Sequence, residues 1–203
     1  MAWRTLFVHF KEMRKYFIAA ALVFVTGVIL GYADSEHFEA ILQSQVKGLQ
    51  ELARSLSMKD HSVVWLFGFI FLNNAIKSVL IIFAGAFFGV LPLFFLVING
   101  MVIGYLAELQ TQTGQFGYFL KGILPHGIFE IPAIVLACAY GLKFGAIVSK
   151  GLFGLLSNRS RQAFAADLQR FRKISLPLIG LLIGTLLVAA IVESVVTPWL
   201  LGM

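Results

Sequence analysis

The sequence predicts an all-α fold, a polytopic integral membrane bundle of about five transmembrane helices, and two observations lead to this prediction. First, 59% of the 203 residues are hydrophobic and 13% are charged, whereas a soluble domain of this length needs a more polar surface. Second, the chain contains five apolar runs close to the roughly 20 residues that a membrane-spanning helix requires. No segment is left over for a soluble domain, so we expect residues 1–203 to form one membrane domain.

The first predicted span covers residues 16–32 and follows a basic leader. A cleaved signal peptide is the alternative, because Gly31-Tyr32-Ala33 resembles a small-residue cleavage site. We favour a retained span. The later spans are predicted at 63–90, 91–108, 119–148 and 174–202.

Two segments between the spans have the pattern of amphipathic helices. In 34–60 the apolar residues recur every three or four positions, at Phe38, Ile41, Leu42, Val46, Leu49, Leu52 and Leu56. We expect an external helix lying on the membrane surface or on the protein's own spans; the alternative is a docking helix for an external partner. The basic segment 149–173 carries a shorter stripe, Phe164, Leu168 and Phe171. This stripe predicts an anchor helix on the inner surface of the lipid bilayer.

The distribution of basic residues predicts the orientation of the chain. The leader carries four basic residues and 149–173 carries six, whereas 33–61 carries three against five acidic residues and 109–118 carries none. Cytoplasmic loops are enriched in Lys and Arg, so the N-terminus is predicted in the cytoplasm and the C-terminus outside. The net charge of +6 then reflects basic loops, and we expect no nucleic-acid partner.

Five pairs of glycines are spaced four residues apart, which puts both members of each pair on one helix face. The pairs are Gly27/Gly31, Gly85/Gly89, Gly100/Gly104, Gly141/Gly145 and Gly180/Gly184. Each pair lets a neighbouring backbone approach closely, either within one protomer or across a dimer surface. We expect most pairs to pack within the protomer, and we expect the protein to be a homodimer.

The predicted spans contain polar and ionisable residues, which are costly in lipid. They are Asn73, Asn74, Lys77, Asn99, Glu108, Lys121, His126, Glu130 and Glu193. An unpaired charge at mid-membrane costs about 3 kcal/mol or more. Glu108 and Lys121 lie near span ends, where long side chains reach the interface. For the others we expect an interior network in which Lys77 pairs with Glu130 and the asparagines cap broken helix ends.

Two prolines in the fourth span predict a break in its helix. Pro125 is suited to the first turn of a helix, where a missing N–H costs nothing. Pro132 then removes the hydrogen bond to the carbonyl of Ile128. We expect either a kink near Phe129 or a short re-entrant piece followed by a helix from about Ile131. Such backbone survives at membrane depth only when protein or a water-filled cavity surrounds it.

His126 and Glu130 lie beside this break, four residues apart and therefore on one helix face. The pair could form a structural hydrogen bond, relay protons, or supply two ligands to a metal such as zinc. Zinc needs three or four ligands, so the missing ones would come from a dimer partner or from Asn or Glu side chains of other spans.

Signatures of catalysis are missing from the chain. There is no His-Glu-x-x-His metalloprotease motif, no Gly-x-Ser-x-Gly elbow and no Walker-type phosphate loop. Asp34, Asp60 and Asp167 all lie outside the predicted spans, which argues against a paired-aspartate protease. We therefore expect no enzymatic activity, unless His126 and Glu130 hold a catalytic metal.

Several motifs together resemble the stage II sporulation protein M family over roughly 60–202. They are Asn73-Asn74, Gly85-x-x-x-Gly89, Asn99-Gly100-x-x-x-Gly104, Leu124-Pro125-His126-Gly127-x-x-Glu130-Ile131-Pro132-Ala133 and Gly141-Leu142-x-x-Gly145. The resemblance implies a multipass protein of the bacterial plasma membrane. The family's namesake joins two cell-wall hydrolases at the septal membrane during engulfment, and is thought to localise them rather than to cut peptidoglycan.

Three functional hypotheses follow. The first is a dimeric membrane scaffold that positions peptidoglycan-remodelling proteins through residues 34–60, with a core organised by the His126/Glu130 segment and a bound zinc ion. The second is a small transporter or channel that uses the intramembrane polar residues, since broken helices with ionisable groups form many transport sites. The third is an intramembrane metal-dependent hydrolase.

Overall fold

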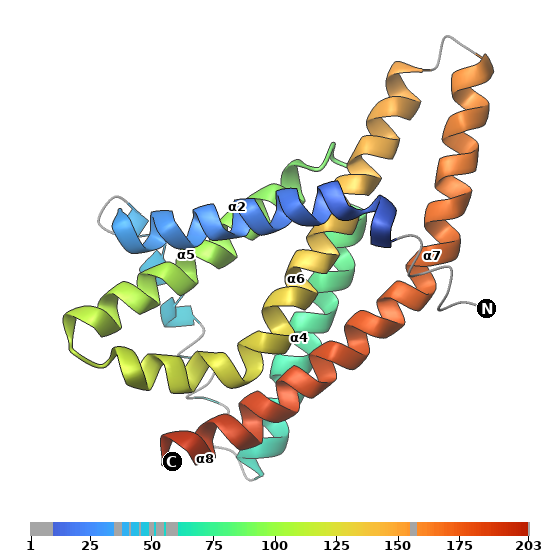
Figure 1. Cartoon of the computed structure of the whole chain (residues 1–203). Coiled ribbons are helices and arrows are strands. Elements are labelled where there is room, and N and C mark those ends of the chain that lie inside the picture. The colour runs from blue at the N-terminus through green and yellow to red at the C-terminus, as the bar shows by residue number, and fades with distance from the viewer. Residues whose placement is uncertain are drawn as a thin grey trace.

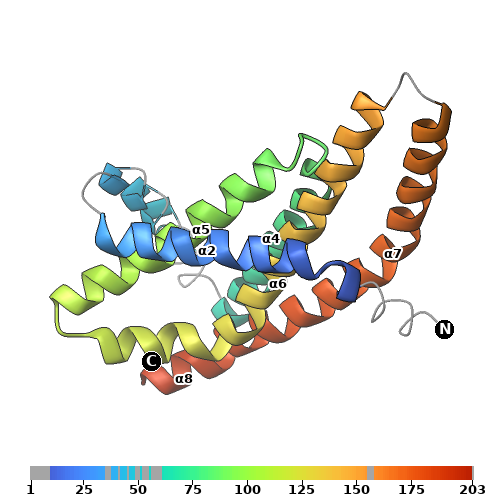
Figure 2. The same cartoon turned by 45° about the horizontal axis from the view of Figure 1, so that its top comes forward.

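The computed structural model describes residues 10–34, 38–40, 42–44, 46–48, 51, 55, 61–154 and 158–202. All regular structure in this part of the chain is helical, which confirms the all-α class. The elements are α2 (Arg14–Ala33), α4 (Ser62–Ala84), α5 (Val90–Gln112), α6 (Phe116–Phe153), α7 (Asn158–Ile191), the π-helical turn η1 (Val192–Val196) and α8 (Thr197–Leu201). In two views α2 crosses in front of the other helices, and α7 runs the length of the molecule (Figure 1, Figure 2).

Five helices are long and apolar enough to cross a membrane, which agrees with the five predicted spans. They are α2, α4, α5, α6 and the helix Arg161–Leu201, which continues through α7, η1 and α8. The shortest has 20 residues. At 1.5 Å per residue it is about 30 Å long, the thickness of the hydrocarbon core of a bilayer. The protein is a polytopic membrane helical bundle.

The second span ends earlier than predicted. Helix α4 stops at Ala84, and a tight turn leads to the start of α5 at Val90. In this turn Phe88 has φ 57° and Gly89 has φ 79°, so two successive residues take the left-handed conformation. Glycine accepts it without cost, whereas phenylalanine does not. Hydropathy does not detect this turn because its residues are as apolar as the helices around it.

Four of the five glycine pairs pack against helix backbones within the protomer. A Cβ added to Gly27 of α2 would lie 2.6 Å from the carbonyl oxygen of Val97 on α5, and one added to Gly141 of α6 would lie 2.8 Å from the carbonyl of Ile81 on α4. These helices therefore approach too closely for any side chain at the contact. Gly180 and Gly184 differ, because an added Cβ at either position would meet nothing within 4 Å.

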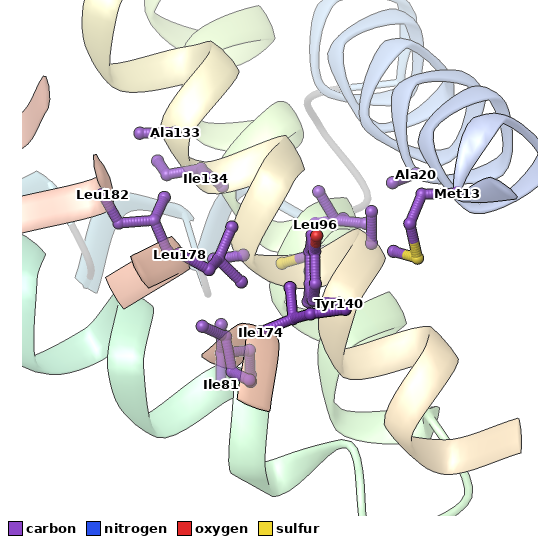
Figure 3. Close-up of a cluster of buried hydrophobic side chains, with 14 of the residues drawn as sticks. Met13, Ala20, Ile81, Leu96, Ala133, Ile134, Tyr140, Ile174, Leu178 and Leu182 are labelled. Carbon is purple, nitrogen blue, oxygen red and sulfur yellow. The ribbon is translucent and has the colours of Figure 1, made fainter. Parts of the chain in front are cut away.

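The hydrophobic core lies where α6 packs against α4 and α7. Tyr140 of α6 is fully buried, as is Leu178 of α7, and Leu182 is 1% exposed. Figure 3 shows these side chains converging with Ile81 of α4 and Ile134 of α6. Contacts with α4 and α7 thus hold the central part of helix α6 from both sides. These contacts also fix the position of the helical turns directly before Ile134.

Helix α6 takes the kinked one of its two predicted forms. It is one α-helix of 38 residues, with Pro125 and Pro132 both inside it. Pro125 therefore does not begin a helix, and the re-entrant version of the prediction is wrong because the helix does not restart after the prolines. Figure 1 shows that the helix instead bends, with its first part running across the molecule before it turns along the bundle. Each proline removes one backbone hydrogen bond, which permits this bend without ending the helix.

The basic segment 149–173 is mostly helical, as its apolar stripe predicts. Helix α6 extends to Phe153, and α7 begins at Asn158 and continues without a break into the last span. Figure 1 shows the two helices as an extended hairpin at one end of the molecule. The ring of Phe171 stacks on Phe144 of α6 with centroids 4.7 Å apart, and Phe164 lies against Gly151. The apolar stripe of this segment thus packs on α6, which differs from the predicted helix anchored flat on lipid.

Helical residues within 38–48 lie against α5. Leu42 is fully buried in a cluster with Met101 and Tyr105, and Phe38 and Val46 pack around it. At these positions the apolar stripe faces the protein's own spans, as one of the two interpretations of this segment expects. The remaining members of the stripe, Ile41, Leu49, Leu52 and Leu56, lie outside the described residues.

Candidate functional site

Three ionisable side chains from two distant parts of the chain meet within the bundle. They are His126 and Glu130 of α6 and Glu193 of η1, and one potential ligand atom from each lies within 4.8 Å of the other two. Among the described residues they form the one group of three or more His, Cys, Asp or Glu side chains close enough to hold a metal ion. The predicted His126/Glu130 pair therefore gains a carboxylate from the last span.

The local helix geometry places each of the three side chains. His126 and Glu130 are one α-helical turn apart, so they project from the same face of α6. Glu193 lies in a π-helical turn, Val192–Val196. π-Turns insert an extra residue into a helix, are rare, and often occur at functional sites. The last span thus departs from regular α-helix at the residue that joins the cluster.

The carboxylate of Glu130 is supported by α4. Asn74 donates a hydrogen bond from Nδ2 to Glu130 Oε1 at 2.9 Å, and Asn73 donates to Asn74 Oδ1 at 3.3 Å. Both asparagines lie in the interior of α4, so the expectation that they cap broken helix ends is wrong. Glu130 thus accepts a hydrogen bond from the amide of Asn74, and the ammonium of Lys77 interacts with it through its charge.

The imidazole of His126 faces α8. Its Nδ1 lies 3.5 Å from the hydroxyl oxygen of Thr197, at the outer limit of hydrogen bonding. The hydroxyl of Thr197 is buried and donates to the carbonyl oxygen of Val192 at 3.2 Å, so the same oxygen can accept from a protonated Nδ1. In that tautomer the lone pair of Nε2 is available to a metal ion.

A cavity of about 430 Å³ adjoins the cluster. Its polar wall consists of His126, Glu130, Lys77 and Asn99, and aromatic and aliphatic side chains of α2, α5 and α6 complete the lining. Lys77 is one helical turn from Asn74, so α4 presents an ammonium and an amide to the same region. The predicted interior polar network therefore surrounds a space large enough for several water molecules or a small ligand.

The donor set is suited to a divalent transition metal. One imidazole and two carboxylates are ligands that zinc, manganese and iron accept, and three protein ligands with an open position are typical of exchangeable or catalytic sites. Zinc binds such atoms at about 2.0–2.2 Å, which puts tetrahedral ligands about 3.3 Å apart. The ligand atoms lie up to 4.8 Å apart, so they must move closer by about 1.5 Å to bind zinc in this geometry.

The other predicted site residues have different surroundings. Asn99 lines the cavity and donates to the carbonyl of Phe95 in its own helix at 2.7 Å. Glu108 is not part of the cluster and accepts a hydrogen bond from Gln112 on the next turn. Pro125 and Pro132 flank the ligand face of α6.

The sequence allows a Glu of another span as a further ligand but does not select Glu193, and it does not point to Thr197. Glu193 was predicted as a member of the polar network, and Thr197 was not singled out. The available signal was that Glu193 is the only ionisable residue of the predicted span 174–202, with a hydroxyl four residues later. Only the tertiary contact between α6 and the last span shows that Glu193 and Thr197 lie beside His126.

Comparison with known proteins identifies the family. Residues 19–198 match stage II sporulation protein M, which is most of the chain. The chain belongs to the stage II sporulation protein M family. Two relatives from Methanocaldococcus jannaschii, both described as uncharacterized proteins, are similar over nearly their whole length. One is 28% identical over 89% of this chain and 93% of its own, and the other is 27% identical over 91% and 82%. No solved structure matches this chain.

Proposed function

We propose that this protein is a membrane scaffold that positions cell-wall hydrolases and catalyses no reaction itself. The observation that supports this most directly is the family match over residues 19–198, together with the absence of the catalytic motifs of soluble and intramembrane proteases from the sequence. The scaffold lies in the plasma membrane with its N-terminus in the cytoplasm and its C-terminus outside. The hydrolases then meet the external end of the bundle, where segment 34–60 begins.

The partner surface is the polar side of segment 34–60. Phe38, Leu42 and Val46 pack toward α5, so a partner meets the opposite side, where Glu39 and Glu51 are exposed. We expect Glu39→Lys with Glu51→Lys to lower the amount of peptidoglycan hydrolase that co-purifies with the protein, as measured by zymography. The matched control is Arg172→Glu with Lys173→Glu, which reverses two charges at the other end of the bundle. If both variants recover equal amounts of hydrolase, segment 34–60 is excluded as the partner surface.

The scaffold is a homodimer joined through α7. The Gly180/Gly184 pair, which has no neighbour within 4 Å, lines an apolar groove of about 680 Å³ with Phe129, Pro177 and Val188. Small residues on a lipid-facing helix allow two backbones to approach closely. We expect Gly184→Leu to convert dimers to monomers in cross-linking experiments, and Gly122→Leu, which replaces another glycine without a close neighbour, to leave them unchanged. A Gly184→Leu protein that still cross-links as a dimer contradicts this interface.

A zinc ion bound by His126, Glu130 and Glu193 organises the core of the scaffold. In support, the three ligand atoms lie within 4.8 Å of one another, and Asn74 and Thr197 orient two of them. Purified protein should contain about one transition-metal ion per chain by elemental analysis, and His126→Ala or Glu193→Gln should remove it. Glu108→Gln is the control, because that carboxylate lies outside the cluster. A metal-free protein after purification from zinc-supplemented cells contradicts the proposal.

The cavity beside the cluster favours a second function, that of a small transporter. Lys77, Asn99, His126 and Glu130 line a space of about 430 Å³ within the spans, and buried ionisable groups in such a position mark many ion and substrate pathways. If this function holds, proteoliposomes should show a proton or cation flux that Glu130→Gln abolishes and Glu108→Gln does not. A scaffold predicts no flux in any of these samples.

A further inference from the structure

A polar pocket at the opposite end of the bundle is not used by the proposed function. It has a volume of about 190 Å³ and lies where the start of α2, the C-terminal part of α6 and the first half of α7 meet. Figure 1 and Figure 2 both show the beginning of α2 close to α7. Its charged lining consists of Lys15, Lys143, Lys150 and Arg170 with Glu12 and Asp167.

The charges of this pocket favour an anion. Four basic and two acidic side chains give a net charge of +2. Arg170 Nη2 lies 2.7 Å from Glu12 Oε1, and this ion pair joins α7 to the segment that precedes α2. A guanidinium has five N–H donors in a fixed plane. Arg170 can therefore hold Glu12 and still donate to the oxygen of a second anion.

A layer of aromatic contacts fixes the three helices beneath the pocket. Phe17 of α2 contacts Phe10 edge-on at 5.7 Å and Tyr140 of α6 at 6.4 Å between ring centroids, while Phe144 of α6 stacks on Phe171 of α7. The basic side chains therefore project from backbones that are already packed together. A ligand does not have to assemble the pocket, which lowers the entropy cost of binding.

The position of the pocket along the bundle matches the headgroup layer of a membrane. Lys15 and Tyr16 begin α2, with the Lys15 ammonium 5.1 Å from the centre of the Tyr16 ring. Lysine and tyrosine at the end of a span are typical of the membrane–water interface. Directly beyond this point α2 is an apolar span. A phosphate at this level can therefore belong to a molecule whose acyl chains run along the helices.

We propose that this pocket binds the phosphate group of an anionic phospholipid headgroup. The four cations match a phosphate that carries net negative charge, whereas the choline of a zwitterionic lipid would bring a fifth cation to a pocket that is already positive. Free inorganic phosphate offers the same chemistry without the acyl chains, so the experiment has to separate the two sources.

Native mass spectrometry of the detergent-purified protein tests the proposal with short-chain phosphatidylglycerol as the probe. We expect one tightly bound phosphatidylglycerol per chain, weaker binding of phosphatidylcholine of equal chain length, and little displacement by millimolar inorganic phosphate. Lys143→Gln with Lys150→Gln should lower the phosphatidylglycerol affinity by about fivefold for each charge removed. Asp167→Asn, which raises the net charge of the pocket, should increase the affinity.

Arg172→Gln with Lys173→Gln is the matched control, because it removes two charges from exposed positions of α7 outside the pocket. We expect it to change the affinity by less than about twofold, since neither side chain lines the pocket. An equal loss in the control and pocket variants would overturn the proposal in favour of a diffuse surface attraction. Complete displacement by inorganic phosphate would overturn the assignment to a lipid. The Asp167→Asn variant tests the electrostatic argument even if the double variant does not fold. Weaker phosphatidylglycerol binding by Asp167→Asn would overturn that argument.

Discussion

At the scale of single residues, the cluster of His126, Glu130 and Glu193 poses a problem of charge. Two carboxylates and an imidazole with ligand atoms within 4.8 Å of one another lie inside helices that cross a membrane, where unpaired charge costs about 3 kcal/mol or more. The hydrogen bond from Asn74 and the charge of Lys77 compensate one carboxylate, that of Glu130, but not that of Glu193. A divalent cation balances both negative charges and also accepts the imidazole, so metal binding accounts for all three side chains at once.

Asn74 is expected to affect the metal without touching it. Removing the hydrogen bond from Asn74 to Glu130 frees the carboxylate to rotate, and loss of such a supporting contact typically weakens metal binding by 10–100-fold. We therefore expect Asn74→Ala to lower zinc affinity by at least about tenfold in competition with a chromophoric chelator. Asn73→Ala is the control, because Asn73 contacts Asn74 rather than a ligand, and we expect a smaller loss. Unchanged affinity in Asn74→Ala would show that Glu130 needs no support.

At the scale of elements, the last span is the part that the sequence describes least completely. Hydropathy predicts a helix over 174–202, and the structure contains one, but no residue pattern predicts the π-turn Val192–Val196. At this turn the last span meets α6, although Glu193 lies more than 60 residues after Glu130 in the chain. The same limit applies to α6, since the proline rules are local and allow either a kink or a break, and only the structure shows that the helix continues through both prolines.

The π-turn itself can be tested by deleting one residue from it. Val195 is 55% exposed on the outside of the turn, so its removal costs little packing. Without the extra residue the turn becomes α-helical, while the helix after it keeps its place because the turn absorbs the insertion. Glu193 lies within the turn, so its carboxylate then points away from His126 and Glu130, and we expect the zinc content after dialysis to fall by at least about tenfold.

Val195→Leu is the control for this deletion, because it alters the same side chain and keeps the register. It should retain the metal. If the deletion variant folds and binds zinc as tightly as the wild type does, the π-turn is not needed for the site.

The packing of α2 on α5 leads to a prediction about stability. Gly100 faces the backbone of α2 so closely that a Cβ would lie 2.9 Å from the amide nitrogen of Val28. Gly100→Leu must therefore push the helices apart, and overpacking of this kind costs about 1–3 kcal/mol. We expect a lower unfolding midpoint in SDS titrations of the detergent-solubilised protein. Gly122→Leu inserts the same side chain at a position of α6 where an added Cβ meets nothing within 4 Å, and it should leave the midpoint unchanged; an equal loss in both variants would contradict the packing argument.

At the scale of the whole molecule, composition and the length of apolar runs suffice to predict five spans, because crossing a membrane is chiefly a requirement for about 20 apolar residues. They do not predict the hairpin of α6 and α7 beyond the apolar region, because the apolar stripe of the basic segment predicts a helix there but not the helix against which it packs. The hairpin is held by contacts such as Phe144 with Phe171, which join residues from two separate helices. The glycine pairs are predicted in part. Their spacing predicts close helix contacts, and only the structure shows which helices make them.

The orientation of the bundle connects both proposals, because it decides which end meets the cell wall and which meets the anionic inner leaflet. The basic residues around Lys143, Lys150 and Arg170 predict that the hairpin lies in the cytoplasm. In a Cys138→Ala background, a membrane-impermeant maleimide should label Arg161→Cys only after the cells are lysed, whereas it should label Glu39→Cys in intact cells. Both positions are exposed on the protein, so a difference in labelling reports the side of the membrane. Labelling of Arg161→Cys in intact cells would show that the bundle has the opposite orientation in the membrane. Segment 34–60 would then lie in the cytoplasm and could not be the contact surface for a cell-wall hydrolase.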